Sequence, residues 1–98
     1  MSIDHRQAAS GRTTDLVNLL RAQPSDPALA RLVEEAEALG RAIAAFHLEG
    51  IRFRMYNVDR LLSPMAGSLP AESGQMFDDI RHHLEAAGFH TRSHQAPG

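Results

Sequence analysis

Apolar residues recur every three or four positions between Pro27 and Glu49. They fall in a 3-4-3-4-3 spacing, at Leu29, Leu32, Ala36, Leu39, Ile43 and Phe46. This spacing places all of them on one face of an α-helix. Asp26 can cap the first turn and Pro27 is favoured at the first helical position, so the start is well marked. The pattern predicts a helix from Pro27 with one continuous apolar stripe.

A second apolar stripe follows over residues 51–62 and is out of phase with the first. Its members are Ile51, Met55, Val58 and Leu62. We expect the helix to continue through them, kinked near Gly50, because Met, Arg and Leu favour a helix. Such a helix would be about 54 Å long at 1.5 Å per residue. In the alternative, residues 51–56 alternate like a half-buried strand, which would pair with a second strand over 89–94.

Two shorter helices are predicted on either side of this element. The predicted helix Thr13–Gln23 has one apolar face and ends before Pro24, because a proline disfavours a helical conformation of the residue before it. A last helix begins between Pro70 and Ser73, with Gly88 at its C-terminal end and Phe89 packing back on the helix. We therefore predict a mainly α fold of three helices with a long central helix, resembling a helical bundle. Residues 12–90 form the single domain, residues 1–11 are a disordered N-terminal segment, and residues 91–98 are a flexible tail.

Composition narrows the class of protein. The chain has 98 residues, no Cys, ten cationic residues that are all Arg, and a formal net charge of −2. Without Cys there is no disulfide framework and no thiolate metal site. The near-neutral charge disfavours broad binding to duplex nucleic acid. No apolar run approaches the roughly 20 residues that cross a bilayer, and the N-terminus lacks a secretory pattern. These features predict a soluble cytoplasmic protein that does not bind a membrane.

The small apolar content suggests that a second chain completes the core. Hydrophobic residues make up 43% of the chain, and those of the long predicted helix are spread over the two stripes. One stripe can cover the chain's own helices while the other meets a partner, most simply in a two-fold homodimer. The predicted interface residues are Leu29, Leu32, Leu39, Ile43 and Phe46 of the first stripe, Ile51, Met55, Val58 and Leu62 of the second, and Phe53 beside them.

Six histidines stand out among the residues that could carry chemistry. Four lie near the C-terminus, and His83, His90 and His94 are the candidates for a metal site. Imidazole binds zinc, nickel and copper, but three or four ligands must converge. Cationic side chains are in any case favoured at a helix C-terminus. We favour surface histidines over a metal site, and we predict no cofactor.

Arg52, Arg54 and Arg60 surround Phe53 and Tyr56. This is the one place where basic and aromatic residues alternate, as they do in single-strand nucleic-acid binders. Because Arg and aromatic residues are also enriched at protein interfaces, we favour an interface.

Motifs for a nucleophile or a nucleotide are missing, and the chain has no Lys for a phosphate loop or a Schiff base. We therefore predict a small, non-enzymatic helical protein, regulatory or accessory, which acts by self-association and contact with a possible protein partner. The alternatives are a metal- or small-ligand-binding protein that uses the C-terminal histidines, and a nucleic-acid-associated regulator.

Overall fold

The computed structural model describes residues 3–89, which form four α-helices and one short 3₁₀ helix. The elements are α1 (His5–Arg21), α2 (Pro27–Ala44), α3 (Leu48–Leu62), η1 (Ser63–Met65) and α4 (Ala71–Ala86). The prediction of a mainly helical fold is confirmed, although four helices form instead of three. The strand alternative is wrong for residues 51–56, which lie within α3, and most of the second predicted strand lies outside the described residues.

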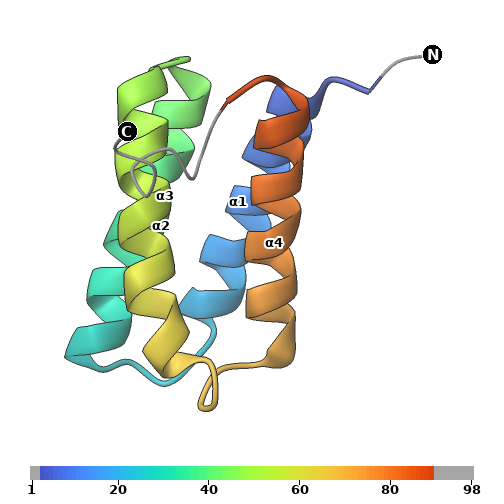
Figure 1. Cartoon of the computed structure of the whole chain (residues 1–98). Coiled ribbons are helices and arrows are strands. Elements are labelled where there is room, and N and C mark those ends of the chain that lie inside the picture. Colours follow the sequence, from blue (N-terminus) through green and yellow to red (C-terminus); the bar gives the residue numbers. More distant parts are fainter. Residues whose placement is uncertain (1–2, 90–98) are drawn as a thin grey trace.

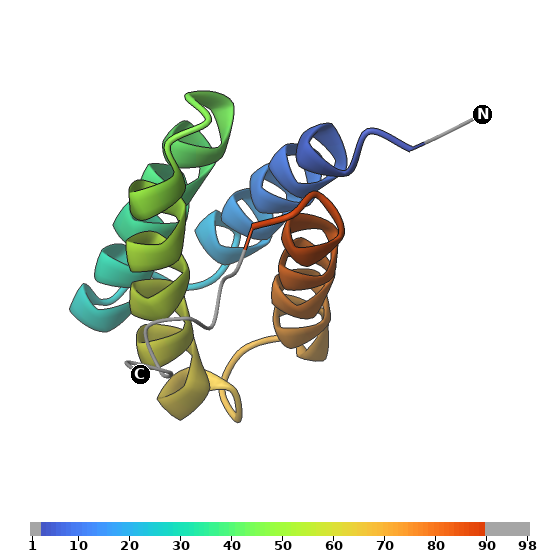
Figure 2. The same ribbon diagram turned by 45° about the horizontal axis from the view of Figure 1, so that its top comes forward.

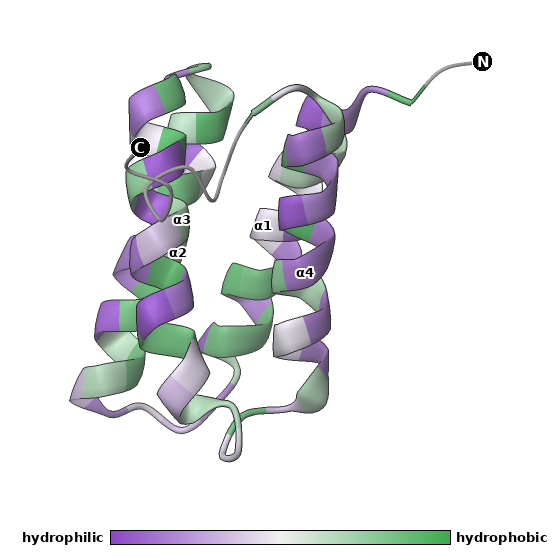
Figure 3. Ribbon diagram, in the orientation of Figure 1, coloured by the Kyte–Doolittle hydropathy of each residue, from purple (hydrophilic) through white to green (hydrophobic). Residues whose placement is uncertain are grey.

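Successive helices run in opposite directions (Figure 1). α1 packs against both α2 and α4, and α3 packs on α2. A view rotated by 45° shows α1 between the α2–α3 pair and α4 (Figure 2). Hydrophobic positions lie on the sides of the helices that face one another, and most hydrophilic positions lie outside (Figure 3). This arrangement determines which sides of α2 and α3 remain available for contact with other molecules.

The first helix begins eight residues earlier than Thr13, so the predicted disorder of residues 1–11 is wrong from His5 onward. Asp4 caps the helix, since its side chain accepts a hydrogen bond of 3.0 Å from the backbone N–H of Gln7. Ala9 is fully buried, and Arg6 donates to the backbone carbonyl of Ile43 at 3.3 Å. These polar residues form a helix because contacts with the rest of the fold stabilise it, which local composition does not indicate.

The predicted long central helix is interrupted at residues 45–47, before Gly50. Phe46 adopts a left-handed conformation with φ of 60°, and its N–H donates to the carbonyl of Ile43 at 3.1 Å. The N–H of His47 donates to the carbonyl of Ala42 at 3.0 Å. Together these bonds form a Schellman motif, which ends α2. His47 then caps α3, because its Nδ1 accepts a bond of 2.8 Å from the N–H of Gly50.

The end of α4 follows the prediction. Gly88 has φ of 99° and its N–H donates to the carbonyl of Glu85 at 3.0 Å. The N–H of Phe89 donates to the carbonyl of Leu84 at 2.9 Å, and Phe89 is buried in the core. This is again a Schellman motif, here with the glycine that the left-handed position favours.

Both apolar stripes are buried within the single chain, because the turn at residues 45–47 folds α3 back against α2. The predicted seam residues inside the core are Leu29, Leu32, Leu39, Ile43, Ile51, Met55, Val58 and Leu62. The phase shift between the stripes therefore results from two separate helices, each directing its own stripe inward. These eight residues are covered by the chain's own helices and present no exposed dimer seam.

Candidate functional site

The outer side of α3 carries two large aromatic side chains that the core does not cover. Phe53 is 56% exposed and Tyr56 is 40% exposed. Glu49 lies one turn before them and Arg60 one turn after, and both are exposed. We call Glu49, Phe53, Tyr56 and Arg60 the α3 stripe. Its position opposite the buried residues of α3 follows from the 3.6-residue period of the helix.

Shallow grooves flank Phe53 on both sides. One groove, of about 630 Å³, lies between α2 and α3. Ala38 and Ala42 of α2 and its C-cap residue Ala45 line it with small side chains. The other, of about 440 Å³, is lined by Glu49, Arg52, Phe53 and Tyr56. Phe53 lines both grooves, so its ring forms a ridge between two depressions. A ridge with adjacent depressions offers a surface with which another molecule can interlock.

The arginines around these aromatics are engaged within the chain. Arg54 Nη1 donates to both carboxylate oxygens of Glu35, at 3.0 and 3.1 Å, and its guanidinium lies 5.1 Å from the centroid of the Phe53 ring. Arg52 donates to Glu49 at 3.2 Å. The guanidinium of Arg60 lies 5.9 Å from the Tyr56 ring, within reach of a cation–π interaction. The predicted basic contact residues therefore lie together, but carboxylates and rings satisfy much of their charge.

Glu35 links α2 to α3 beneath this surface. Its partial burial disfavours the charged form, but hydrogen bonds from Asn57 and Arg54, together with the charge of Arg54, outweigh burial and lower the pKa of Glu35. The Asn57 amide donates to Glu35 at 3.1 Å. Because the carboxylate stays charged and bonded to two side chains of α3, it holds that helix in a defined orientation on α2.

Of the predicted interface residues, Phe46 and Phe53 are the ones that the structure leaves exposed. Phe46 is 62% exposed and lies in the turn between α2 and α3. The Arg6 guanidinium lies 4.6 Å from its ring centroid, and the Phe89 ring lies 5.6 Å away. Phe46 thus has its own intramolecular partners, which reduces its availability for an external contact.

Tyr56 is not among the ten predicted seam residues, although the sequence groups it with Phe53 and the neighbouring arginines. It lies three positions after Phe53. In the sequence it also lies between Met55 and Val58, two consecutive members of the second apolar stripe, and does not belong to that stripe. Two aromatics three positions apart on the polar side of an amphipathic helix are neighbours on its surface. An exposed aromatic pair of this kind needs an explanation, whereas single exposed apolar residues do not.

The described histidines lie near helix ends, with His5 at the start of α1, His47 just before α3, and His82 and His83 near the end of α4. His83 Nδ1 lies 2.9 Å from Nδ1 of His5, so a hydrogen bond between the imidazoles joins α4 to the first turn of α1. The His82 ring packs edge-on to that of His83, with centroids 5.8 Å apart. Within residues 3–89 no group of three or more His, Asp or Glu could hold a metal ion. The candidates His90 and His94 lie outside the described residues.

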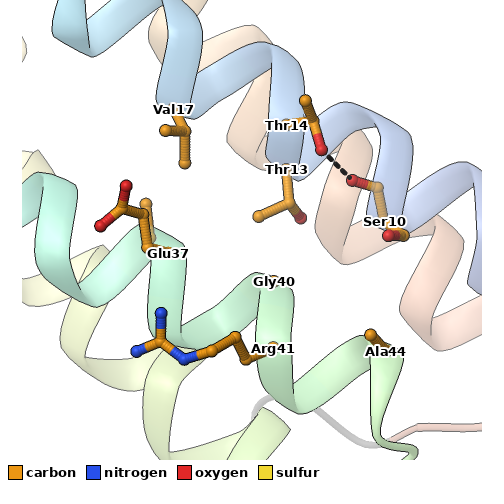
Figure 4. A pocket seen from close by; sticks show the side chains of 9 residues that line it. Ser10, Thr13, Thr14, Val17, Glu37, Gly40, Arg41 and Ala44 are labelled. Atoms are coloured by element: carbon orange, nitrogen blue, oxygen red, sulfur yellow. Dashed lines mark hydrogen bonds between the residues drawn. The ribbon is translucent and has the colours of Figure 1, made fainter.

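A further groove of about 400 Å³ lies between α1 and α2 (Figure 4). A Cβ built at Gly40 would lie 3.5 Å from the methyl group of Thr13, an ordinary van der Waals contact between the two helices. Two hydroxyls in this groove are already used, since Thr13 donates to the carbonyl of Ala9 and Thr14 to that of Ser10. The groove is therefore best explained by close helix packing.

Comparison with protein-family models, curated proteins and solved structures gives no match to this chain. No helix within the described residues combines the length and the apolar character needed to cross a membrane. The contacts and exposure of the described residues therefore provide the evidence for function.

Proposed function

We propose that this chain is a small, non-enzymatic interaction protein that acts through protein–protein contacts, self-association among them, made by the α3 stripe. The observation that carries the proposal is the exposure of Phe53 and Tyr56 side by side on a helix whose opposite side is buried. Tyr, Phe and Arg are among the residues enriched at interfaces, because their large flat groups bury area at low entropic cost. We expect the contact to be made in the cytoplasm, as the composition indicates.

The support under the stripe favours a surface that is ready to bind. Ile51, Met55 and Val58 are fully buried on the inner side of α3, so apolar packing fixes the position of this helix on the core. The bonds from Glu35 to Arg54 and Asn57 add a polar link to α2. A helix held in this way loses little conformational entropy when a partner docks, and that lowers the cost of binding.

Site-specific photo-crosslinking tests this function. Phe53 is replaced by p-benzoylphenylalanine, and the same residue is placed at Asn18, an exposed position on α1, as the control. Irradiation in cells of the native source should give a discrete crosslinked protein from position 53 and none from position 18. Mass spectrometry of the product identifies a second copy of the chain or another protein, and either supports the proposal. Equal patterns from both positions, or no product from position 53, would overturn it.

A further inference from the structure

The α3 stripe has the same spacing when it is read in either direction. Its residues lie at positions 49, 53, 56 and 60, so the intervals are 4, 3 and 4, symmetrical about the midpoint between Phe53 and Tyr56. An acidic residue stands at one end, a basic residue at the other, and the two aromatics lie between them. All four side chains are exposed. A stripe of this kind is complementary to itself when a second copy runs antiparallel to it.

We propose that the partner of the α3 stripe is a second copy of this chain, bound about a two-fold axis that passes the midpoint of α3. This inference rests on the proposed function and adds the identity of the partner and its orientation. In the dimer Glu49 faces Arg60 of the partner subunit, and Phe53 faces Tyr56 of the partner subunit. Each pair occurs twice, as the symmetry of an isologous interface requires.

The geometry of the helix brings these pairs to the same level. Glu49 and Arg60 are 11 positions apart, which corresponds to about 16 Å along the helix axis. Glu49 and Arg60 each lie about 8 Å from the two-fold axis along the helix, on opposite sides of it. The two-fold rotation therefore brings Glu49 of one copy to the level of Arg60 of the partner subunit. The 4-3-4 spacing is also the spacing of seam positions in helices that pack along their length. A parallel arrangement would instead place like charges opposite each other, which disfavours it.

The surroundings of the stripe suit this arrangement. The ion pairs among the described residues leave Arg60 without a carboxylate partner, while its guanidinium lies near the Tyr56 ring. The groove lined by Glu49, Arg52, Phe53 and Tyr56 lies beside the midpoint of the stripe. It can take an aromatic ring from the opposing helix, and the ridge formed by Phe53 can enter the equivalent groove of the partner.

The area involved predicts a weak dimer. Phenylalanine and tyrosine side chains bury roughly 150–250 Å² each when fully covered. With 56% of Phe53 and 40% of Tyr56 exposed, the four rings of a dimer remove about 400 Å² from water. This is well below the roughly 1,200–2,000 Å² of a stable interface, even with the flanking residues added. We therefore expect weak association that becomes detectable only at high protein concentration.

Sedimentation equilibrium at low ionic strength tests the charge pairing. The wild type should dimerise with rising concentration, and Glu49→Arg or Arg60→Glu alone should weaken association about tenfold, because each places like charges opposite each other twice. The double variant Glu49→Arg/Arg60→Glu should recover association, since it exchanges the two charges. Mixing the two single variants should also restore it. Glu72→Arg is the matched control, because Glu72 occupies the first turn of α4 as Glu49 does in α3.

Disulfide formation tests the direction of the helices. The chain has no Cys, so Glu49→Cys and Arg60→Cys each introduce a single thiol. Under mild oxidation the mixture should give a dimer that joins one variant to the other. Either variant alone should give little, because in the antiparallel pair two copies of one position lie about 16 Å apart, too far for a disulfide.

The outcomes separate this inference from the proposed function. A wild type that stays monomeric to millimolar concentration overturns the second copy as partner, and the crosslinking experiment still tests the stripe. If Phe53→Glu abolishes the dimer but Glu49→Arg/Arg60→Glu does not restore dimerisation, the antiparallel orientation is wrong. The α3 stripe is then still the surface through which the copies associate. If the dimer survives Phe53→Glu, a different surface joins the copies, and both the inference and self-association through the α3 stripe fail.

Discussion

Phe46 allows a sharp test of the turn that separates α2 from α3. Its φ of 60° is a left-handed conformation that costs a residue with a Cβ about 1–2 kcal/mol and costs glycine much less. The variants Phe46→Gly and Phe46→Ala both remove the ring and its contacts with Arg6 and Phe89. They differ by one methyl group. We therefore expect the glycine variant to be more stable than the alanine variant by about 1 kcal/mol.

A helix interior provides the control with the opposite sign. Gly74 lies within α4, and a Cβ built there meets nothing within 4 Å. Because alanine is favoured over glycine by about 1 kcal/mol inside a helix, Gly74→Ala should raise the stability by that amount. Replacing glycine by alanine is thus expected to lower the stability at position 46 and to raise it at position 74. A general effect of glycine on the entropy of the unfolded chain would have the same sign at both positions.

Urea and thermal unfolding, followed by circular dichroism, measure both differences. For a domain of this size, 1 kcal/mol moves the Tm by roughly 4–8 °C, so the two variants at position 46 are easily resolved. If Phe46→Ala is as stable as Phe46→Gly, the alanine has adopted a right-handed conformation. The two helices would then join through residues 45–47, and the reasoning from the Schellman motif would be refuted.

Two further predictions concern the α2–α3 junction and acid stability. Gly50→Ala should give no stabilisation, unlike Gly74→Ala, because a Cβ at position 50 would lie 2.6 Å from His47 Nδ1 and disturb a cap worth about 1 kcal/mol; urea unfolding of the two variants gives the comparison. The pKa of Glu35 is lowered in the fold. The pKa of Asp79 is also lowered, because Asp79 accepts a hydrogen bond from the side chain of Arg12. Both carboxylates therefore stabilise the fold above the unfolded-state pKa of about 4, and this contribution is lost as the pH falls through their lower folded values. Glu35→Gln should flatten the acid side of a plot of unfolding free energy against pH, and an unchanged slope would contradict this assignment.

The two Schellman motifs show how far local sequence reaches. At Gly88 the glycine indicates the end of α4, because it is the residue best suited to a left-handed position. At residue 46 the same motif uses phenylalanine, so the sequence suggests a kink at Gly50 instead. Contacts of Phe46 with α1 and with Phe89 offset the backbone cost, and these contacts exist only in the folded chain. A break that depends on such contacts cannot be predicted from helix propensity alone.

The start of α1 was missed for a related reason. His5 and Arg6 look like part of a polar tail, yet His5 bonds to His83 and Arg6 bonds to the carbonyl of Ile43. Both partners are distant in the sequence and approach only when α4 and α2 pack on α1. Asp4 caps this helix, but a short polar turn is not stable without such contacts.

The candidate site was predicted in part. Grouping Arg52, Arg54 and Arg60 with Phe53 and Tyr56 identifies the exposed side of α3, and an interface was favoured over nucleic acid. Eight of the ten predicted interface residues are instead buried in the chain's own core. An apolar stripe shows that a helix face must be covered, but it does not show which element covers it. Here the chain's own helices cover both stripes. The other side of α3 remains exposed. Its two aromatic residues are too few to form an apolar period that could be recognised in the sequence.

The amino-acid sequence by itself determines that this protein is helical, which face of each helix is apolar, and where the capped ends at Asp26 and Gly88 lie. These properties depend on residues a few positions apart, so a helical period and capping chemistry suffice to predict them. The tertiary structure decides that α2 and α3 separate at Phe46, that α1 extends to His5, and that Phe53 and Tyr56 stay exposed. Each of these depends on contacts between residues far apart in the chain, and their free energy becomes available only once the helices pack together.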